Sequence, residues 1–275
     1  MNQILRDTSV GALTRAIEEN PLGFVPAFRR WPRTELHDEE GITWSIADIP
    51  YPLFNVVLRT RLSAARAESA IERIVNEAQK RHVPILWEVW PSSEPRDLKE
   101  RLEQHGFAAA GRPPGMALDL DKLREALPSV PGLTIRRVGS AEDWERFLEI
   151  WRGVYEVPGF VARAMGELFR HAPEGTLFSY VGWQEGQPVA ISQMLLHAGV
   201  AGIYSVATIP EARRKGIGTQ ITLAALHDAR AMGYRVSILH SSKMGLGVYR
   251  RLGFREYCTL ARYLWTPKET KDEEA

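Results

Sequence analysis

Residues 200–219 read Val-Ala-Gly-Ile-Tyr-Ser-Val-Ala-Thr-Ile-Pro-Glu-Ala-Arg-Arg-Lys-Gly-Ile-Gly-Thr, an apolar run followed by a basic turn that contains glycine. The β-branched and aromatic run at 203–209 is typical of a strand, and Pro210 ends it because proline has no N–H for a ladder. From Ile217 onward apolar positions recur near the helical period, which predicts a helix beginning close to Arg214. The stretch is therefore predicted to form a strand, a turn and a helix.

The predicted turn is suited to hold phosphate groups. The first turn of a helix has unpaired N–H groups and the positive end of the helix dipole. Gly216 and Gly218 have no Cβ that would keep a ligand at a distance. Arg213, Arg214 and Lys215 add positive charge at the same place. The sequence thus predicts an anion site between the strand and the helix.

Spacing separates three kinds of phosphate-binding loop. A Walker loop needs a lysine after its second glycine, whereas Lys215 precedes Gly216. A dinucleotide fingerprint needs a third glycine where Ile221 stands. The remaining pattern, R-x-x-G-x-G at residues 213–218, resembles the acyl-CoA pyrophosphate loop of the GNAT superfamily of N-acetyltransferases. For the basic run taken alone, the alternative interpretation is a solvated helix end.

A second stretch carries the same resemblance. After a predicted strand at 236–240 the chain reads Tyr249-Arg-Arg-Leu-Gly-Phe254, which matches the family's Y-x-x-x-G-F pattern at the end of a helix. The resemblance implies that acetyl-CoA is the cosubstrate and that Tyr249 protonates the departing CoA thiolate as general acid. A tyrosine in a helix, taken alone, is also explained by packing.

The resemblance further implies which residues bind acetyl-CoA. The parallel strands at 204–208 and 236–240 are expected to diverge at their C-terminal ends, so that the pantetheine arm lies between them. The arm would then pair with backbone groups of the first strand, as an added strand does. The implied binding residues are Val206, Ala207, Thr208, Arg213, Arg214, Lys215, Gly216, Ile217, Gly218, Thr219 and Ser242, the last standing where many relatives have an asparagine.

The acceptor side departs from the family's pattern. Many relatives keep a glutamate four residues before the position aligned with Val206, and this chain has Gly202 there. The alternatives for accepting the amine proton are Tyr204, His197, His240 or a water chain, and histidine suits this role best by its pKa. Either histidine is also explained as a satisfied polar residue. The resemblance suggests an acceptor pocket near Tyr155, Phe160 and Phe169, which are equally well explained as core aromatics.

The first half repeats the predicted order of elements without the loop chemistry. Strand, long helix, strand, short helix, Gly-Phe and strand are predicted within 42–120 and again within 204–265, which indicates a domain duplication. Arg61-Leu-Ser-Ala-Ala-Arg66 stands in place of the glycine loop, and Leu102 in place of Tyr249. This half resembles a degenerate GNAT domain that serves packing or forms one wall of the substrate cleft. The alternative is a chance coincidence of element order.

The expected fold class is α/β, with mixed sheets of the α+β kind. A join between two GNAT-like domains is expected within 122–132, because two prolines and a glycine fall within 128–132. We expect a degenerate domain at 1–125 and a catalytic domain at 126–275. Each is expected to be a mixed, largely antiparallel sheet flanked by helices, and the diverging strand pair of the second would hold acyl-CoA.

Composition limits the partners. The chain has 275 residues, 44% hydrophobic and 25% charged, as in a soluble globular protein large enough for two domains. A net charge of +1 favours neither nucleic acid nor a membrane as partner. One cysteine, Cys258, excludes an intrachain disulfide, and the seven histidines show no metal-ligand spacing, so no metal is expected. The absence of a signal-peptide pattern and of a long apolar stretch predicts a cytoplasmic location.

These observations favour an N-acetyltransferase. We expect it to transfer the acetyl group of acetyl-CoA to a small-molecule or peptide amine by direct attack on the thioester. The alternative is a non-catalytic acyl-CoA sensor or interaction module, which the absence of the glutamate at Gly202 favours. Acceptor identity, acyl chain length and oligomeric state have no signal in the sequence.

Overall fold

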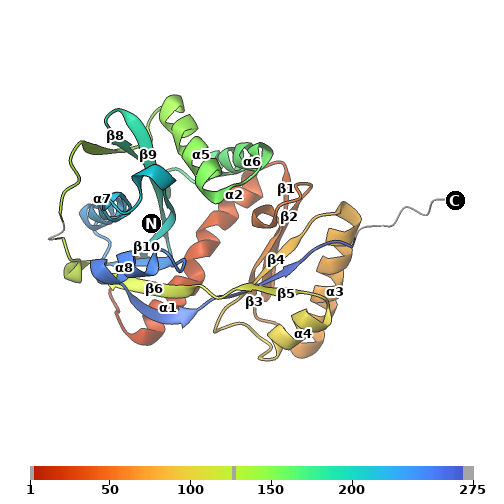
Figure 1. Cartoon of the computed structure of the whole chain (residues 1–275). Coiled ribbons are helices and arrows are strands. Elements are labelled where there is room, and N and C mark those ends of the chain that lie inside the picture. Colours follow the sequence, from red (N-terminus) through yellow and green to blue (C-terminus); the bar gives the residue numbers. More distant parts are fainter. Residues whose placement is uncertain (1–2, 126–127, 269–275) are drawn as a thin grey trace. The chain divides into compact units, whose positions relative to one another are not determined.

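The structure is a computed structural model that describes residues 3–125 and 128–268. The described chain forms two compact units, each built on one mixed sheet with flanking helices (Figure 1). Unit 1 contains the described residues up to Ala27 together with Pro113–Cys258. Unit 2 contains Phe28–Arg112 and the described residues from Thr259 onward. The chain therefore passes between the units three times.

Unit 2 is a six-stranded sheet in the order β1-β2-β3-β4-β13-β5. Its strands are β1 (Thr34–Glu39), β2 (Ile42–Ala47), β3 (Val56–Thr60), β4 (Ile85–Val89), β5 (Ala108–Gly111) and β13 (Ala261–Trp265). The pair β3 and β4 is parallel and the other described pairs are antiparallel. Helix α3 (Ala64–Arg81) connects β3 to β4, and α4 (Leu98–Gln104) follows β4.

Helix α3 shows why unit 2 folds as its sequence predicts. Ser63 caps it, because the Ser63 side chain accepts a hydrogen bond from the Arg66 N–H, and His82 ends it in the left-handed conformation. Its apolar face, with Ile71 and Ile74, is fully buried in the same cluster as strand residues such as Trp87. The helical spacing of those apolar residues made this element predictable.

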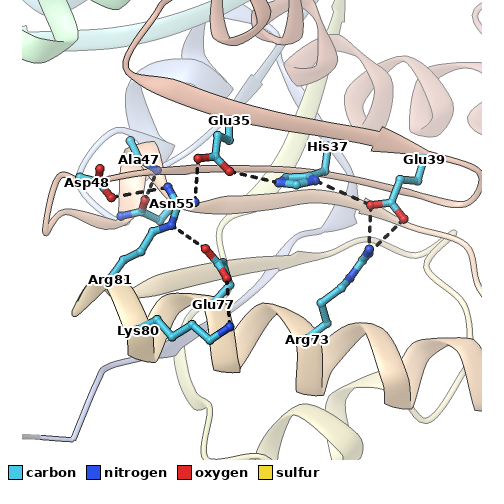
Figure 2. Close-up of polar contacts among 10 residues, drawn as sticks. All are labelled: Glu35, His37, Glu39, Ala47, Asp48, Asn55, Arg73, Glu77, Lys80 and Arg81. Carbon is cyan, nitrogen blue, oxygen red and sulfur yellow. Dashed lines mark hydrogen bonds and ion pairs between the residues drawn. The ribbon is translucent and has the colours of Figure 1, made fainter.

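Strand β1 was not predicted, because its segment is rich in charged residues. Figure 2 shows that these charges contact α3: Arg81 donates to Glu35 at 2.7 Å, and Arg73 donates to Glu39 at 3.0 Å. His37 stacks on Trp44 of the neighbouring strand with ring centroids 4.0 Å apart, and burial lowers the pKa of His37. The polar residues therefore belong to an edge strand whose charges pair with a helix.

Unit 1 is a seven-stranded sheet in the order β12-β6-β11-β10-β9-β8-β7. Its strands are β6 (Pro114–Asp119), β7 (Leu133–Arg137), β8 (Leu177–Gln184), β9 (Gln187–His197), β10 (Val200–Thr208), β11 (Val236–His240) and β12 (Arg255–Thr259). Its helices are α1 (Val10–Glu19), η1 (Asn20–Phe24), α5 (Ala141–Tyr155), α6 (Gly159–Arg170), α7 (Ile217–Ala231) and α8 (Leu246–Leu252). The short helix α2 (Val25–Arg30) spans the boundary between the units.

The two sheets share a run of four corresponding strands. The order β3-β4-β13-β5 in unit 2 matches β10-β11-β6-β12 in unit 1. In each run the first two strands are parallel and joined by a long helix, α3 or α7. The third strand of each run comes from the other half of the sequence. The mixed α/β class is confirmed, and the shared order supports an internal duplication.

The compact units do not coincide with the expected division into residues 1–125 and 126–275. The last strand of each half pairs in the sheet of the other half, and the described residues up to Ala27 lie in unit 1. The expected join at 122–132 includes residues 126 and 127, which lie outside the described residues. Within the described ranges, no helix is long and apolar enough to cross a bilayer.

An ion pair between a buried carboxylate and a partly exposed arginine joins β4 to β13 in unit 2. Glu88 on β4 lies opposite Arg262 on β13, and Arg262 Nη2 is 3.1 Å from Glu88 Oε1. The Glu88 side chain is 7% exposed and that of Arg262 is 38% exposed. Burial raises the pKa of Glu88, and Arg262 opposes this rise.

We predict that Arg262→Ala lowers the free energy of unfolding by about 3 kcal/mol at about pH 8, because it leaves a buried carboxylate without its cation. Since the folded-state pKa of Glu88 is above its unfolded value, protonation of Glu88 favours the folded state as pH falls, so the loss shrinks towards about pH 5. Urea unfolding at both pH values measures it.

The control variant is Arg29→Ala, which breaks the more exposed pair of Arg29 with Asp38 in the same unit. It should cost less than about 1 kcal/mol at either pH. A loss in Arg262→Ala that is equal at the two pH values would contradict the interpretation of Glu88 as a buried, charge-compensated carboxylate.

Candidate functional site

Strands β10 and β11 part within the sheet of unit 1. Their parallel register joins 201–203 to 237–239, whereas β10 continues to Thr208. The pairing of β10 with β9 is interrupted by a bulge between Tyr204 and Ala207, and Ser205 has a φ of 50°. A bulge bends its strand. The two strands therefore diverge at their carboxyl ends, which is where open α/β sheets bind ligands.

The turn after β10 presents backbone N–H groups. Arg214 and Gly216 have φ values of 61° and 85°, and Gly216 is the N-cap of α7. The N–H groups of Thr219 and Gln220 bond to the Gly216 carbonyl at 3.0 and 3.1 Å. Ile217 precedes them and, as a first-turn residue, has no helix carbonyl to bond. The helix begins at Ile217, three residues later than expected, because the turn takes left-handed residues.

The cations of this turn have different roles. Arg213 Nε donates to the Thr208 carbonyl at 3.1 Å, so this side chain holds the turn against the end of β10. Arg214 and Lys215 are exposed. A Cβ at Gly218 would lie 3.5 Å from Thr208 Oγ1, an ordinary contact, so packing does not require glycine there. The absence of a side chain at Gly218 leaves space beside the N–H groups.

Tyr249 lies on α8 and is 9% exposed. Its ring packs edge-on against Phe254 at 5.9 Å and lies over Gly245, where a Cβ would be 2.7 Å from the Tyr249 ring. Ser242 Oγ accepts from the Gly245 N–H at 3.1 Å, so Ser242 fixes the loop beneath the ring. Burial, with a smaller effect of Tyr155, raises the pKa of Tyr249. The phenol is therefore protonated at neutral pH, as a proton donor must be.

Tyr155 at the end of α5 also reaches the bulge. Its hydroxyl donates to the Val206 carbonyl at 3.4 Å, while the residue is 44% exposed. Phe160 on α6 is also exposed, whereas Phe169 on the same helix packs against Phe24 with ring centroids 6.2 Å apart. All three expected acceptor-side aromatics belong to unit 1, where Tyr155 contacts β10 and Phe169 contacts Phe24.

Asn20, from the N-terminal segment, fills the space beside Gly202. A Cβ at Gly202 would overlap Asn20 Oδ1 and would lie 2.6 Å from a ring carbon of Tyr204. The Asn20 side chain is fully buried, and its amide nitrogen donates to the carbonyls of His197 at 3.0 Å, Leu195 at 3.3 Å and Val200 at 3.5 Å. Asn20 Oδ1 accepts from the Tyr204 hydroxyl at 2.7 Å. The family's glutamate has no room at this position.

Asn20 was not predicted from the sequence, because no local signal points to it. It follows the helical spacing of residues 10–19, and it is 184 positions away from Tyr204. Both histidines that were expected as proton acceptors lie close to Asn20 or Tyr204: the Asn20 amide donates to the His197 carbonyl, and His240 lies beside Tyr204. The ring of His240 is 6.3 Å from that of Tyr204, and burial lowers the pKa of His197. Among the described residues, no group of three or more histidine, cysteine or acidic side chains is placed to hold a metal ion.

The corresponding strands of unit 2 are closed by the chain itself. Beyond the β3–β4 pairing, the Glu94 N–H donates to the Thr60 carbonyl at 3.0 Å and the Leu62 N–H donates to the Glu94 carbonyl at 3.2 Å. The Trp90 indole donates to the Leu58 carbonyl at 3.0 Å. The edge of β3 that corresponds to the diverging part of β10 is therefore already paired.

Residues 134–257 match the family model described as an acetyltransferase (GNAT) domain. This segment is a GNAT domain. The match begins in β7 and ends in β12, so it omits β6 and the N-terminal segment with Asn20, although both belong to the same compact unit. The glycine turn, the diverging strands β10 and β11, and Tyr249 all lie within the matched residues 134–257.

Solved structures of similar fold span nearly the whole chain. A GCN5-related N-acetyltransferase from Kribbella flavida is 22% identical, with a TM-score of 0.71 over 93% of this chain and 95% of that one. A tandem GNAT protein from the clavulanic acid biosynthesis pathway is 17% identical, with a TM-score of 0.65 over 96% and 97%. At these identities the likeness establishes the fold. No curated protein matched the sequence.

We predict that Gly202→Ala destabilises the protein by about 1 to 3 kcal/mol, because the added methyl overlaps a side chain that four hydrogen bonds hold in place. In an Asn20→Ala background the same substitution should cost at least about 1 kcal/mol less. Urea unfolding of the parent, the two single variants and the double variant measures the coupling free energy between the two positions.

Gly218→Ala is the matched control, since its added methyl meets only an ordinary contact. It should change the free energy of unfolding by less than about 1 kcal/mol. Strictly additive effects of Asn20→Ala and Gly202→Ala would show that the two positions do not compete for one space.

Proposed function

We propose that this protein transfers the acetyl group of acetyl-CoA to an amine by direct attack of the amine on the thioester. One observation carries the proposal: in the GNAT domain, the diverging pair β10 and β11 leads directly into the glycine turn at the N-terminus of α7. Membership of this segment in the GNAT family supports acyl transfer from acetyl-CoA.

The residues of the turn and of β10 fit acyl-CoA. The pyrophosphate would be held by N–H groups of Gly216, Ile217 and Gly218 and by the cations of Arg214 and Lys215. Thr219, whose N–H bonds to the Gly216 carbonyl, would contribute its hydroxyl. Arg213 would support the turn through its bond to Thr208. The pantetheine amides would pair with backbone groups of Val206, Ala207 and Thr208, which have no register partner on β11 in the described sheet. Ser242 would contribute by fixing its loop.

Tyr249 is proposed as the proton donor to the leaving thiolate. Attack of the amine nitrogen forms a carbon–nitrogen bond and an oxyanion; collapse of the oxyanion then breaks the carbon–sulfur bond. The proton that the sulfur gains matches the one that the amine loses. The raised pKa of Tyr249 keeps the phenol protonated but makes it a weaker acid. Its contribution should therefore be modest.

A non-catalytic acyl-CoA sensor is the second candidate, and Gly202 favours it because no carboxylate stands there to accept the amine proton. Release of free CoA from acetyl-CoA should be measured with an alkylamine, an amino acid, an aminoglycoside and a peptide with a free N-terminus. Amine-dependent release supports the enzyme. Acetyl-CoA binding without any amine-dependent release supports the sensor.

We predict that acetyl-CoA binds once per chain, and that Gly218→Val weakens this binding by more than about tenfold, because a β-branched side chain occupies the phosphate's space. Titration calorimetry gives the number of sites and the affinity. Ser63→Ala, at the corresponding helix start in unit 2, is the control and should leave the affinity unchanged. Two comparable sites, or parental affinity in a folded Gly218→Val variant, would contradict the assignment.

We predict that Tyr249→Phe lowers kcat by about 10- to 1000-fold, with the lower end expected because a thiolate is already a fair leaving group. The affinity for acetyl-CoA should change much less, because the turn and the strands provide it. Steady-state kinetics and thermal melting are measured together. Tyr180→Phe removes a hydroxyl that donates to Asp228 at 2.8 Å in the same unit and serves as control. A Tyr249→Phe variant with parental melting and parental kcat would make Tyr249 a packing residue.

A further inference from the structure

The side chains of Tyr204 and His240 lie close together where β10 diverges from β11. Tyr204 directly follows Ile203, the last residue of β10 in register with β11. Its hydroxyl reaches Asn20, which belongs to a segment outside the family match but inside the same compact unit. His240, directly after the last paired residue of β11, has its ring 6.3 Å from that of Tyr204. The pair thus stands at the start of the diverging strands.

The hydrogen bonds of Asn20 determine the direction of the one between Asn20 and Tyr204. The amide nitrogen of Asn20 faces three backbone carbonyls, so its oxygen faces Tyr204. An amide oxygen only accepts, and the Tyr204 hydroxyl therefore donates its hydrogen to Asn20. Any further hydrogen bond at the Tyr204 oxygen is one that it accepts. A substrate N–H or O–H group at this oxygen would therefore donate to it.

The ring of Tyr204 is also held in place. Phe24 packs edge-on against it with centroids 5.4 Å apart, and Phe24 in turn contacts Phe169 of α6. Gly202 leaves the space that both Asn20 and the Tyr204 ring occupy, since a Cβ there would meet both. Asn20 and the Tyr204 ring can therefore occupy their positions only because residue 202 has no side chain.

We infer that Tyr204, held by Asn20, accepts a hydrogen bond from the acceptor amine and orients its nitrogen towards the thioester, in the place where relatives use a carboxylate. The inference rests on the proposed acetyl transfer and specifies its acceptor side. A neutral phenol carries no charge to strip the ammonium proton, so Tyr204 orients the amine and does not deprotonate it. Asn20 is a positioning residue that acts through Tyr204.

The test uses the panel amine with the highest kcat/KM for the parent. Tyr204→Phe should raise the KM for this amine about tenfold, the worth of one hydrogen bond to a substrate. Calorimetry should show the same change in the Kd of the amine for the protein saturated with CoA. The Kd of acetyl-CoA should stay within about twofold of the parent. Asn20→Ala should act in the same direction, and should add little in a Tyr204→Phe background.

The controls separate this inference from the proposed function. Tyr180→Phe, which removes a hydroxyl elsewhere in unit 1, should leave the amine parameters unchanged. If the parent binds acetyl-CoA but acetylates no amine, the proposed function and the inference both fall. A second outcome overturns the inference alone. In it the parent acetylates its amine, and the Tyr204→Phe variant melts like the parent and keeps the parental KM and Kd for the amine. Equal losses for amine and acetyl-CoA overturn it too, because they indicate a structural role.

Discussion

The site in unit 1 depends on the bulge at residues 204–207 of β10. Because the bulge ends the parallel register after Ile203, the rest of β10 leaves β11 and offers its backbone to a ligand. The same displacement brings Tyr204 to Asn20 and the Val206 carbonyl to Tyr155. It also places Thr208 beside the turn that begins α7, where Arg213 bonds to it. One local irregularity thus relates the proposed acceptor side, the strand gap and the proposed anion site.

Unit 2 has the same strand order, but its corresponding parallel strands have no gap between them. Its strands β3 and β4 match β10 and β11 in order and direction, yet the segment that contains Glu94 pairs with the free edge of β3. A helix follows β3 as well, but it begins with Ser63 as its cap and has no glycine turn. Since β13 completes this sheet and β6 completes the other, each half of the chain supplies a strand that the other half requires.

Sequence reasoning succeeded where the signal is local. The helix of α3, the glycine turn at 213–218 and the Y-x-x-x-G-F stretch follow from spacing along the chain, and the fold family followed from them. It failed where the decisive contact joins residues far apart in the sequence, and where a strand is rich in charged residues. Strand β1 was not predicted because its segment is rich in charged residues, some of which pair with α3. The exchange of β6 and β13, and the role of Asn20, depend on partners more than a hundred residues away.

The most direct test is a crystal structure of the full chain with acetyl-CoA. We predict the pyrophosphate at the N–H groups of residues 216–218, the pantetheine arm between β10 and β11, and the thioester close to the hydroxyl of Tyr249. A pyrophosphate bound at residues 61–66 of unit 2, or an arm that does not enter between β10 and β11, would contradict this prediction.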